Sequence, residues 1–191
     1  MGSGPIAGLA KAVGVLKRLK RAGWARKLGM GDPESVAEHS FRAAFLAMVL
    51  SDLRGLDSAK AMRMALLDDL PEAITGDLTP EEKAEIGAGR ALEAEEGALR
   101  SILSPLPPGL REAYLGLWRE AQGGETPESR LVRDVDKLEM ALQALEYLEE
   151  GWPLEGLMEF MESARAGIRD GELSALADEI IHEARRHPKR Y

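Results

Sequence analysis

The chain has 191 residues, 45% of them apolar, and a formal net charge of −8. This acidic balance argues against non-specific binding to nucleic acid, although a bound cation can still bring a small phosphate-bearing substrate to an acidic site. Because cysteine is absent, disulfides, thiolate zinc sites and cysteine nucleophiles are excluded, and any metal must be bound by histidine and carboxylate ligands.

Apolar residues recur at helical spacing along nearly the whole chain, so the sequence predicts an all-α fold. We expect one domain over residues 1–191, because this length supports a single substantial core and no long linker divides it. The first segment is too short and too interrupted to span a membrane, and we expect a soluble, cytoplasmic protein. Helices are predicted, in chain order, at about 5–21, 34–53, 58–70, 81–103, 110–121, 126–150, 153–167 and 172–186.

Local signals mark several helix ends. Ile6, Leu9, Val13 and Leu16 form an apolar stripe on the first helix, which we interpret as amphipathic. Thr79-Pro80 followed by Glu82 is typical of a capping box that begins a helix. Thr126-Pro-Glu-Ser gives a similar signal for the long helix that follows.

Two adjacent aspartates, Asp68 and Asp69, end the apolar run 64–67. A run patterned for the core should not end on two carboxylates, because a buried charge is costly unless it is paired or bound to metal. The alternative is that one of them merely caps the turn before Pro71. That alternative accounts poorly for both, because they face different sides and an aspartate is unfavourable at a helix C-terminus.

Two further residues on other predicted helices have the chemistry of metal ligands. His39 is the only histidine before residue 182, and on its own it would more often be a hydrogen-bonded core residue than a ligand. Asp136 interrupts the otherwise apolar stripe of Val132, Met140 and Tyr147, where a buried pair with an arginine is the alternative. Asp134 and Lys137 of the same helix are expected to be solvated, since they fall on another face. Carboxylates with imidazole suit Mn²⁺, Co²⁺, Fe²⁺, Mg²⁺ or Zn²⁺.

Glu72 and Asp77 follow the aspartate pair closely. Glu72 lies one turn beyond Asp68 and is a candidate general acid or base, whereas Asp77 follows Gly76 and would ordinarily be a turn-forming residue.

A basic and aromatic cluster precedes the histidine helix. Arg21, Arg26 and Lys27 are candidates to bind a phosphate, and Trp24 is a candidate to pack on a sugar or base. The alternative is that Trp24 is a core residue and the cations are solvated.

Taken in order, three blocks resemble the HD-domain phosphohydrolases, in particular their 5′-deoxynucleotidase type. The blocks are Glu34-Ser-Val-Ala-Glu-His39-Ser, the segment from Ala65 to Pro80 with its Asp68-Asp69, and Asp134-Val-Asp136-Lys-Leu-Glu-Met-Ala-Leu-Gln-Ala144. The resemblance implies a helical bundle whose motif-bearing core covers about 16–150, with C-terminal helices at 153–186.

The resemblance also implies roles for the residues of the three blocks and of the basic cluster. His39, Asp68, Asp69 and Asp136 match the divalent-metal ligands, Glu72 the catalytic acid or base, and Asp77 a catalytic or substrate-contacting position. Trp24 would lie against the deoxyribose and an arginine, either Arg21 or Arg26, on the phosphate. The implied reaction is hydrolysis of deoxynucleoside 5′-monophosphates, usually by a homodimer. From the acidic charge and the lack of a membrane-spanning segment, we expect no nucleic-acid or membrane partner.

One position departs from the family pattern, because Asp68 stands where the first residue of the His-Asp pair is expected. An aspartate can still ligate through oxygen, and the resulting three carboxylates favour harder ions such as Mn²⁺ or Mg²⁺. Two other functions stay open: a nucleotide-binding protein that has lost catalysis, and a hydrolase of another phosphorylated nucleotide.

Overall fold

The computed structural model describes residues 3–187, and no β-strand occurs within that range. The prediction of an all-α fold is therefore confirmed. The helices of the described range are α1 (Ser3–Leu16), α2 (Ala22–Leu28), α3 (Val36–Arg54), α4 (Ser58–Asp68), α5 (Glu72–Thr75), α6 (Pro80–Ile86), α7 (Ala88–Ile102), α8 (Pro108–Gly123), α9 (Pro127–Glu149), α10 (Leu154–Gly167) and α11 (Gly171–Arg186).

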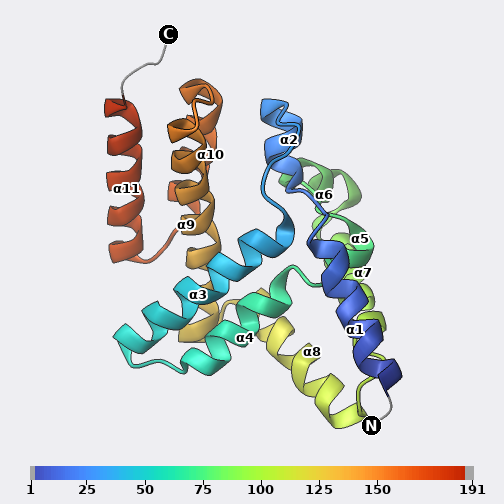
Figure 1. Cartoon of the computed structure of the whole chain (residues 1–191). Helices are drawn as coiled ribbons and strands as arrows, with labels where there is room; N and C mark the ends of the chain where they lie inside the picture. Colours follow the sequence, from blue (N-terminus) through green and yellow to red (C-terminus); the bar gives the residue numbers. More distant parts are fainter. Residues whose placement is uncertain (1–2, 188–191) are drawn as a thin grey trace.

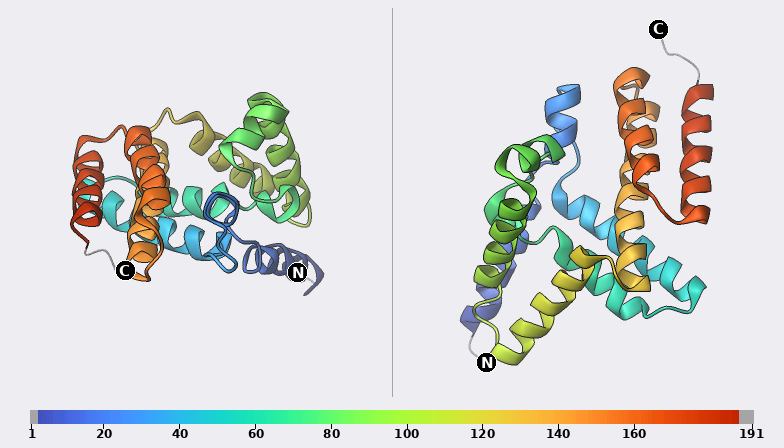
Figure 2. Two further views of the ribbon diagram at one scale, coloured as in Figure 1. Left: turned by 90° about the horizontal axis from the view of Figure 1, so that it is seen from above. Right: turned by 180° about the vertical axis from the view of Figure 1, so that it is seen from behind.

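Helix α9 runs through the middle of the molecule (Figure 1). Helices α10 and α11 lie beside α9, and α3 and α4 cross near one of its ends (Figure 1). Helices α1, α5, α6 and α7 lie on the opposite side from α11, as the views from above and behind also show (Figure 2). Two apolar clusters fill the interior. The larger joins α3, α4, α9, α10 and α11, and the smaller joins α1, α7 and α8 with the end of α4.

The predicted caps are present. At α6, the Thr79 side chain accepts from the backbone N–H of Glu82, and the Glu82 carboxylate accepts from the N–H of Thr79. Helix α9 begins in the same way at Thr126 with Ser129. Such reciprocal bonds satisfy amide groups that the first helical turn leaves without partners.

The prediction of the first helix is wrong over residues 17–21. The chain leaves α1 at Leu16 and begins a separate helix, α2, after Arg21. The backbone of residues 19–21 pairs instead with the segment before α3. Val36 donates to the Leu19 carbonyl (2.8 Å), and Arg21 donates to the Glu34 carbonyl (3.0 Å). This contact joins residues far apart in sequence, so local periodicity carried no sign of it.

The apolar stripe of α1 is only partly buried. Leu16 belongs to the smaller apolar cluster and Leu9 packs against it, whereas Ile6 and Val13 are exposed. No helix in the described range combines the length and apolarity that a membrane span requires. The cytoplasmic location stays a prediction.

Candidate active site

His39 lies in the second turn of α3, a helix that begins at a capping box between Ser35 and Glu38. Its side chain is 1% exposed. The Nε2 atom lies 3.0 Å from Asp136 Oδ1 and 3.4 Å from Asp69 Oδ2, and Nδ1 contacts Glu139 Oε2. The imidazole therefore presents one nitrogen to a carboxylate pair and the other to a buried glutamate.

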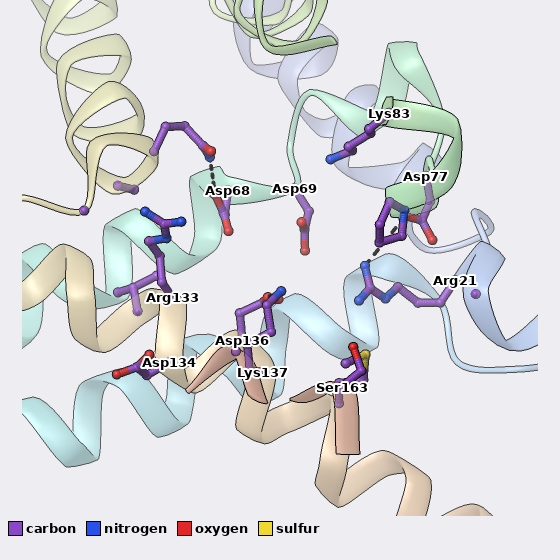
Figure 3. Close-up of a pocket in the computed structure, with 18 of the residues that line it drawn as sticks. Arg21, Asp68, Asp69, Asp77, Lys83, Arg133, Asp134, Asp136, Lys137 and Ser163 are labelled. Atoms are coloured by element: carbon purple, nitrogen blue, oxygen red, sulfur yellow. Dashed lines mark hydrogen bonds and ion pairs between the residues drawn. The ribbon is translucent and has the colours of Figure 1, made fainter. Parts of the chain in front are cut away.

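Asp68 and Asp69 end α4, and their side chains make different contacts (Figure 3). Asp69 takes the C-cap position, yet its carboxylate faces His39 and accepts from Ser40 Oγ at 3.2 Å. Asp68 Oδ1 accepts a hydrogen bond from Gln122 Nε2 at 2.6 Å. Neither side chain therefore serves only to cap the turn before Pro71.

Asp136 projects from α9 toward the same space, and Lys137 lies beside it with Nζ 2.7 Å from Oδ2. The alternative of a buried pair with an arginine is not what the structure contains. The expectation that Asp134 is solvated is wrong: this residue is buried, and it accepts hydrogen bonds from the backbone N–H groups of Arg169 and Asp170. Asp134 therefore fixes the connection between α10 and α11.

The carboxylates differ strongly in their proton affinity. Burial, with the nearby charge of Asp69, raises the pKa of Asp68 to about 7 and that of Glu72 to about 9. Burial also opposes ionisation of Asp136, but Lys137 and His39 outweigh it and hold the pKa of Asp136 well below its usual range. Glu72 Oε2 is buried and has no hydrogen-bond partner among residues 3–187.

The neighbours of His39 favour the protonated form of its imidazole. Burial and the charge of Arg21 disfavour the imidazolium, whereas hydrogen bonds to Asp136 and Glu139 favour it and raise the pKa of His39 well above its usual range. A divalent ion on Nε2 would replace that proton, because a metal-bound histidine is neutral.

Arg21 and Asp77 lie on the other side of Asp69 from Asp68 (Figure 3). Asp77 Oδ2 accepts from the backbone N–H of Ala22 at 2.5 Å, and Oδ1 lies 3.7 Å from Arg21 Nη1. Burial opposes the charge of Arg21, but Asp69 and Asp77 outweigh it and raise its pKa above the usual value. Asp77 is therefore more than a turn-forming residue, because it holds the start of α2 and its arginine.

Trp24 is 2% exposed, so the alternative that it is a core residue describes most of its surface. Its indole N–H donates to Glu34 Oε1 at 2.9 Å, and its ring packs on Phe160 with centroids 4.1 Å apart. Trp24 is nevertheless among the residues that line the cavity. Arg26 points elsewhere and pairs with Glu82, and it is not among the residues that line the cavity.

Two groups of side chains could hold a cation around His39. Glu34, His39 and Glu139 offer ligand atoms within 4.8 Å of one another. However, Glu139 already accepts from His39 and from Arg42, and burial with the charge of Glu139 raises the pKa of Glu34 to about 7. The Nε2 side, with Asp69 and Asp136, fits a divalent ion better, because both carboxylates face the cavity.

The cavity measures about 1090 Å³ and collects many charged groups. Besides the residues above, its lining includes the cationic side chains of Lys27, Lys83, Arg130, Arg133, Lys137 and Arg169. Arg133 and Arg169 are exposed and form no side-chain hydrogen bond or ion pair within the described range. A space of this size suits a small ligand, and its lining presents both carboxylates and cations to that ligand.

The family model described as HD domain matches residues 13–175, which is most of the chain. The chain belongs to the HD domain family. Among curated relatives of this HD domain, the 5′-deoxynucleotidase HDDC2 of Danio rerio is 35% identical over 178 residues, covering 93% of this chain and 86% of that protein. The Homo sapiens protein of the same name is 34% identical, covering 91% and 83%. A solved structure of a conserved hypothetical protein from Pyrococcus furiosus has a TM-score of 0.73 at 37% identity, covering 93% of this chain and 98% of that one.

Sequence reasoning missed four residues around this HD site: Arg42, Gln122, Lys137 and Glu139. Two of them had a usable signal, because Arg42 follows His39 by three positions and Glu139 follows Asp136 by three, which places each pair on one helix face. Lys137 was expected in solvent. Gln122 lies 54 residues from Asp68, and no local pattern connects them.

Proposed function

We propose that this HD domain is a metal-dependent phosphomonoesterase that hydrolyses deoxynucleoside 5′-monophosphates to deoxynucleoside and phosphate. Relatives named 5′-deoxynucleotidase, matched over most of both chains, support the substrate class. The observation that carries the proposal is the convergence of His39, Asp69 and Asp136 on one side of a cavity that also contains Arg21 and Glu72.

The proposed ligands of the divalent ion are His39, Asp68, Asp69 and Asp136. Three carboxylates and one imidazole form a donor set that favours Mn²⁺ or Mg²⁺ over softer ions, with Co²⁺, Fe²⁺ and Zn²⁺ as alternatives. The chemistry that a bound divalent ion supplies here is polarisation of a phosphoryl oxygen and a lower pKa for a water molecule.

The chain's own residues supply binding and proton transfer. Arg21, held by Asp77, donates charge-assisted hydrogen bonds to the phosphate, and it serves better than Arg26, whose charge is already paired with Glu82. A water molecule adds to phosphorus as the bond between phosphorus and the 5′ oxygen breaks. Glu72 gives its proton to that departing oxygen, and the proton that the water loses restores Glu72. Its pKa of about 9 keeps it protonated at neutral pH, which suits a general acid.

The deoxyribose is proposed to lie against the cavity-facing edge of Trp24. Because Phe160 and Tyr147 pack on the indole, this edge cannot turn away when a ligand enters. A rigid apolar edge suits a sugar that lacks a 2′ hydroxyl.

The experiment is phosphate release from a panel of deoxy- and ribonucleoside 5′-monophosphates by metal-stripped protein supplied with one ion at a time. We expect Mn²⁺-dependent release from the deoxy substrates, and its loss in Asp69→Asn at unchanged helical content. No release with any ion, but tight nucleotide binding, would replace this proposal with a catalytically impaired nucleotide-binding protein.

A second candidate substrate is a nucleotide with a longer phosphate chain. Lys83, Arg133 and Arg169 also line the cavity, and the last two have no ion-pair partner in the described range. Such cations suit additional phosphates. The same panel should therefore include deoxynucleoside di- and triphosphates, and faster release from these would favour the second candidate.

We also propose that the protein is a homodimer formed through α3. Phe41 and Phe45 lie one turn apart on this helix and are 73% and 53% exposed. Two neighbouring exposed phenylalanines are typical of an interface and are costly in solvent.

A further inference from the structure

Helix α8 holds Asp68 by two hydrogen bonds. Trp118 Nε1 donates to the backbone carbonyl of Asp68 at 3.2 Å, and Gln122 Nε2 donates to Oδ1 of the same residue at 2.6 Å. The two donors lie one helical turn apart on α8, and Trp118 is 1% exposed. Gln122 therefore extends from a helix that the apolar core keeps in place.

The two carboxylate oxygens of Asp68 have different surroundings. The amide nitrogen of Gln122 faces Oδ1, and this oxygen accepts the hydrogen bond. Oδ2 forms no hydrogen bond or ion pair within residues 3–187, and both side chains line the cavity. Figure 3 shows Asp68 with its hydrogen bond drawn and with Asp69 and Asp136 across the open space.

We infer that Gln122 is a positioning residue that allows an aspartate at position 68 to act as a metal ligand, by holding Oδ1 so that Oδ2 faces a bound divalent ion. The inference rests on the metal site of the proposed function. It concerns the position at which this chain departs from the His-Asp pair, where a shorter side chain has to be directed by a partner. A hydrogen-bonded neighbour of this kind fixes the orientation of a ligand and commonly changes metal affinity when it is removed.

The chemistry of the amide gives a sharp test. Gln122 can donate to Asp68, and after rotation its oxygen could accept from the N–H of a histidine at the same position. A glutamate at 122 can only accept while it is ionised, so it would repel Asp68 but would suit a histidine. The effect of Gln122→Glu should therefore depend on which residue occupies position 68.

The experiment is titration calorimetry with Mn²⁺ alone on the full chain, with Asp68→His and Gln122→Glu made singly and together, and with Gln122→Leu as a second variant. We expect Gln122→Leu and Gln122→Glu to weaken Mn²⁺ binding by about 10- to 100-fold. In the Asp68→His background, Gln122→Glu should weaken binding by no more than about twofold or should strengthen it. Far-UV circular dichroism of each metal-free variant verifies that it is folded.

The outcomes distinguish a failure of the proposed metal site from a failure of the proposed role of Gln122. Absence of Mn²⁺ binding by the unmodified protein would overturn the proposed metal site itself. Unmodified protein that binds, with Gln122→Leu and Gln122→Glu binding equally well, would overturn only the role of Gln122. An equal loss from Gln122→Glu in both backgrounds would also overturn it, because Gln122 would then act independently of Asp68.

Discussion

Replacing Glu139 with glutamine should weaken metal binding although this residue lies behind the histidine. Glu139 is fully buried and receives His39 Nδ1 on one oxygen and Arg42 on the other, with Arg42 Nε at 2.8 Å. Glutamine keeps the shape and can still accept from Nδ1, but it removes the negative charge that makes the imidazole a stronger donor to an ion.

The size of the effect follows from which contacts survive. Loss of a supporting partner behind a metal-binding histidine costs about 10- to 100-fold in affinity, or about 1.4–2.8 kcal/mol. Arg42 is not left unpaired, because it still contacts Gln143 and Glu146, each at 2.6 Å. The free energy of unfolding should therefore fall by about 1.5–3 kcal/mol, the contribution of one charged hydrogen bond, rather than by the larger cost of a stranded buried charge.

Calorimetric titration with Mn²⁺ and urea unfolding of the metal-free protein measure the two quantities. Glu146→Gln is the matched control, because it removes the other, exposed carboxylate partner of Arg42 and should change stability by about 0.2–1 kcal/mol with no change in affinity. The reasoning is refuted if Glu139→Gln binds Mn²⁺ as tightly as the unmodified protein, or if the control weakens binding equally.

Three further predictions concern proton affinity, the core and association. The pKa of Glu72 is about 9 in the folded protein against an ordinary 4.5, so between these pH values the folded state keeps a proton that the unfolded chain loses, and the stability contributed by Glu72 declines as pH rises. Glu72→Gln should remove that decline when urea unfolding is followed from acidic to alkaline pH. An unchanged slope of stability against pH would contradict the assignment. Trp24→Ala should lower the free energy of unfolding by about 3–5 kcal/mol, whereas a loss below about 1 kcal/mol in urea unfolding would mean that the indole is not packed as described. The double change Phe41→Ser and Phe45→Ser should convert the dimer to a monomer, as measured by light scattering, and should change the free energy of unfolding by only about 0.5 kcal/mol. Persistence of the dimer would exclude this face of α3 as the interface.

The sequence predicted best those features that depend on short spacing. The helical fold, the caps at Thr79 and Thr126, and the proximity of His39, Asp69 and Asp136 all agree with the structure. A carboxylate that interrupts an apolar stripe has few arrangements available, so its direction toward other polar groups follows from the cost of burying charge.

Features that depend on distant partners were predicted poorly. Asp134 looked solvated because its neighbours on α9 gave no sign that the backbone of residues 169 and 170 would cover it. The choice between Arg21 and Arg26 likewise depended on where the chain turned after α1, and that turn is fixed by pairing with the segment before α3.

Helix α2, which carries Trp24 along one wall of the cavity, is attached to its two neighbours by different forces. Toward α6 the contacts are ionic, since Arg26 pairs with Glu82 and Lys27 with Glu81 at 2.9 Å, both near the surface. Toward α10 the contacts are apolar, through Trp24 and Phe160. Salt screens the ionic attachment and leaves the apolar one intact. A rise in ionic strength therefore weakens the attachment of this wall to α6 and leaves its attachment to α10 in place.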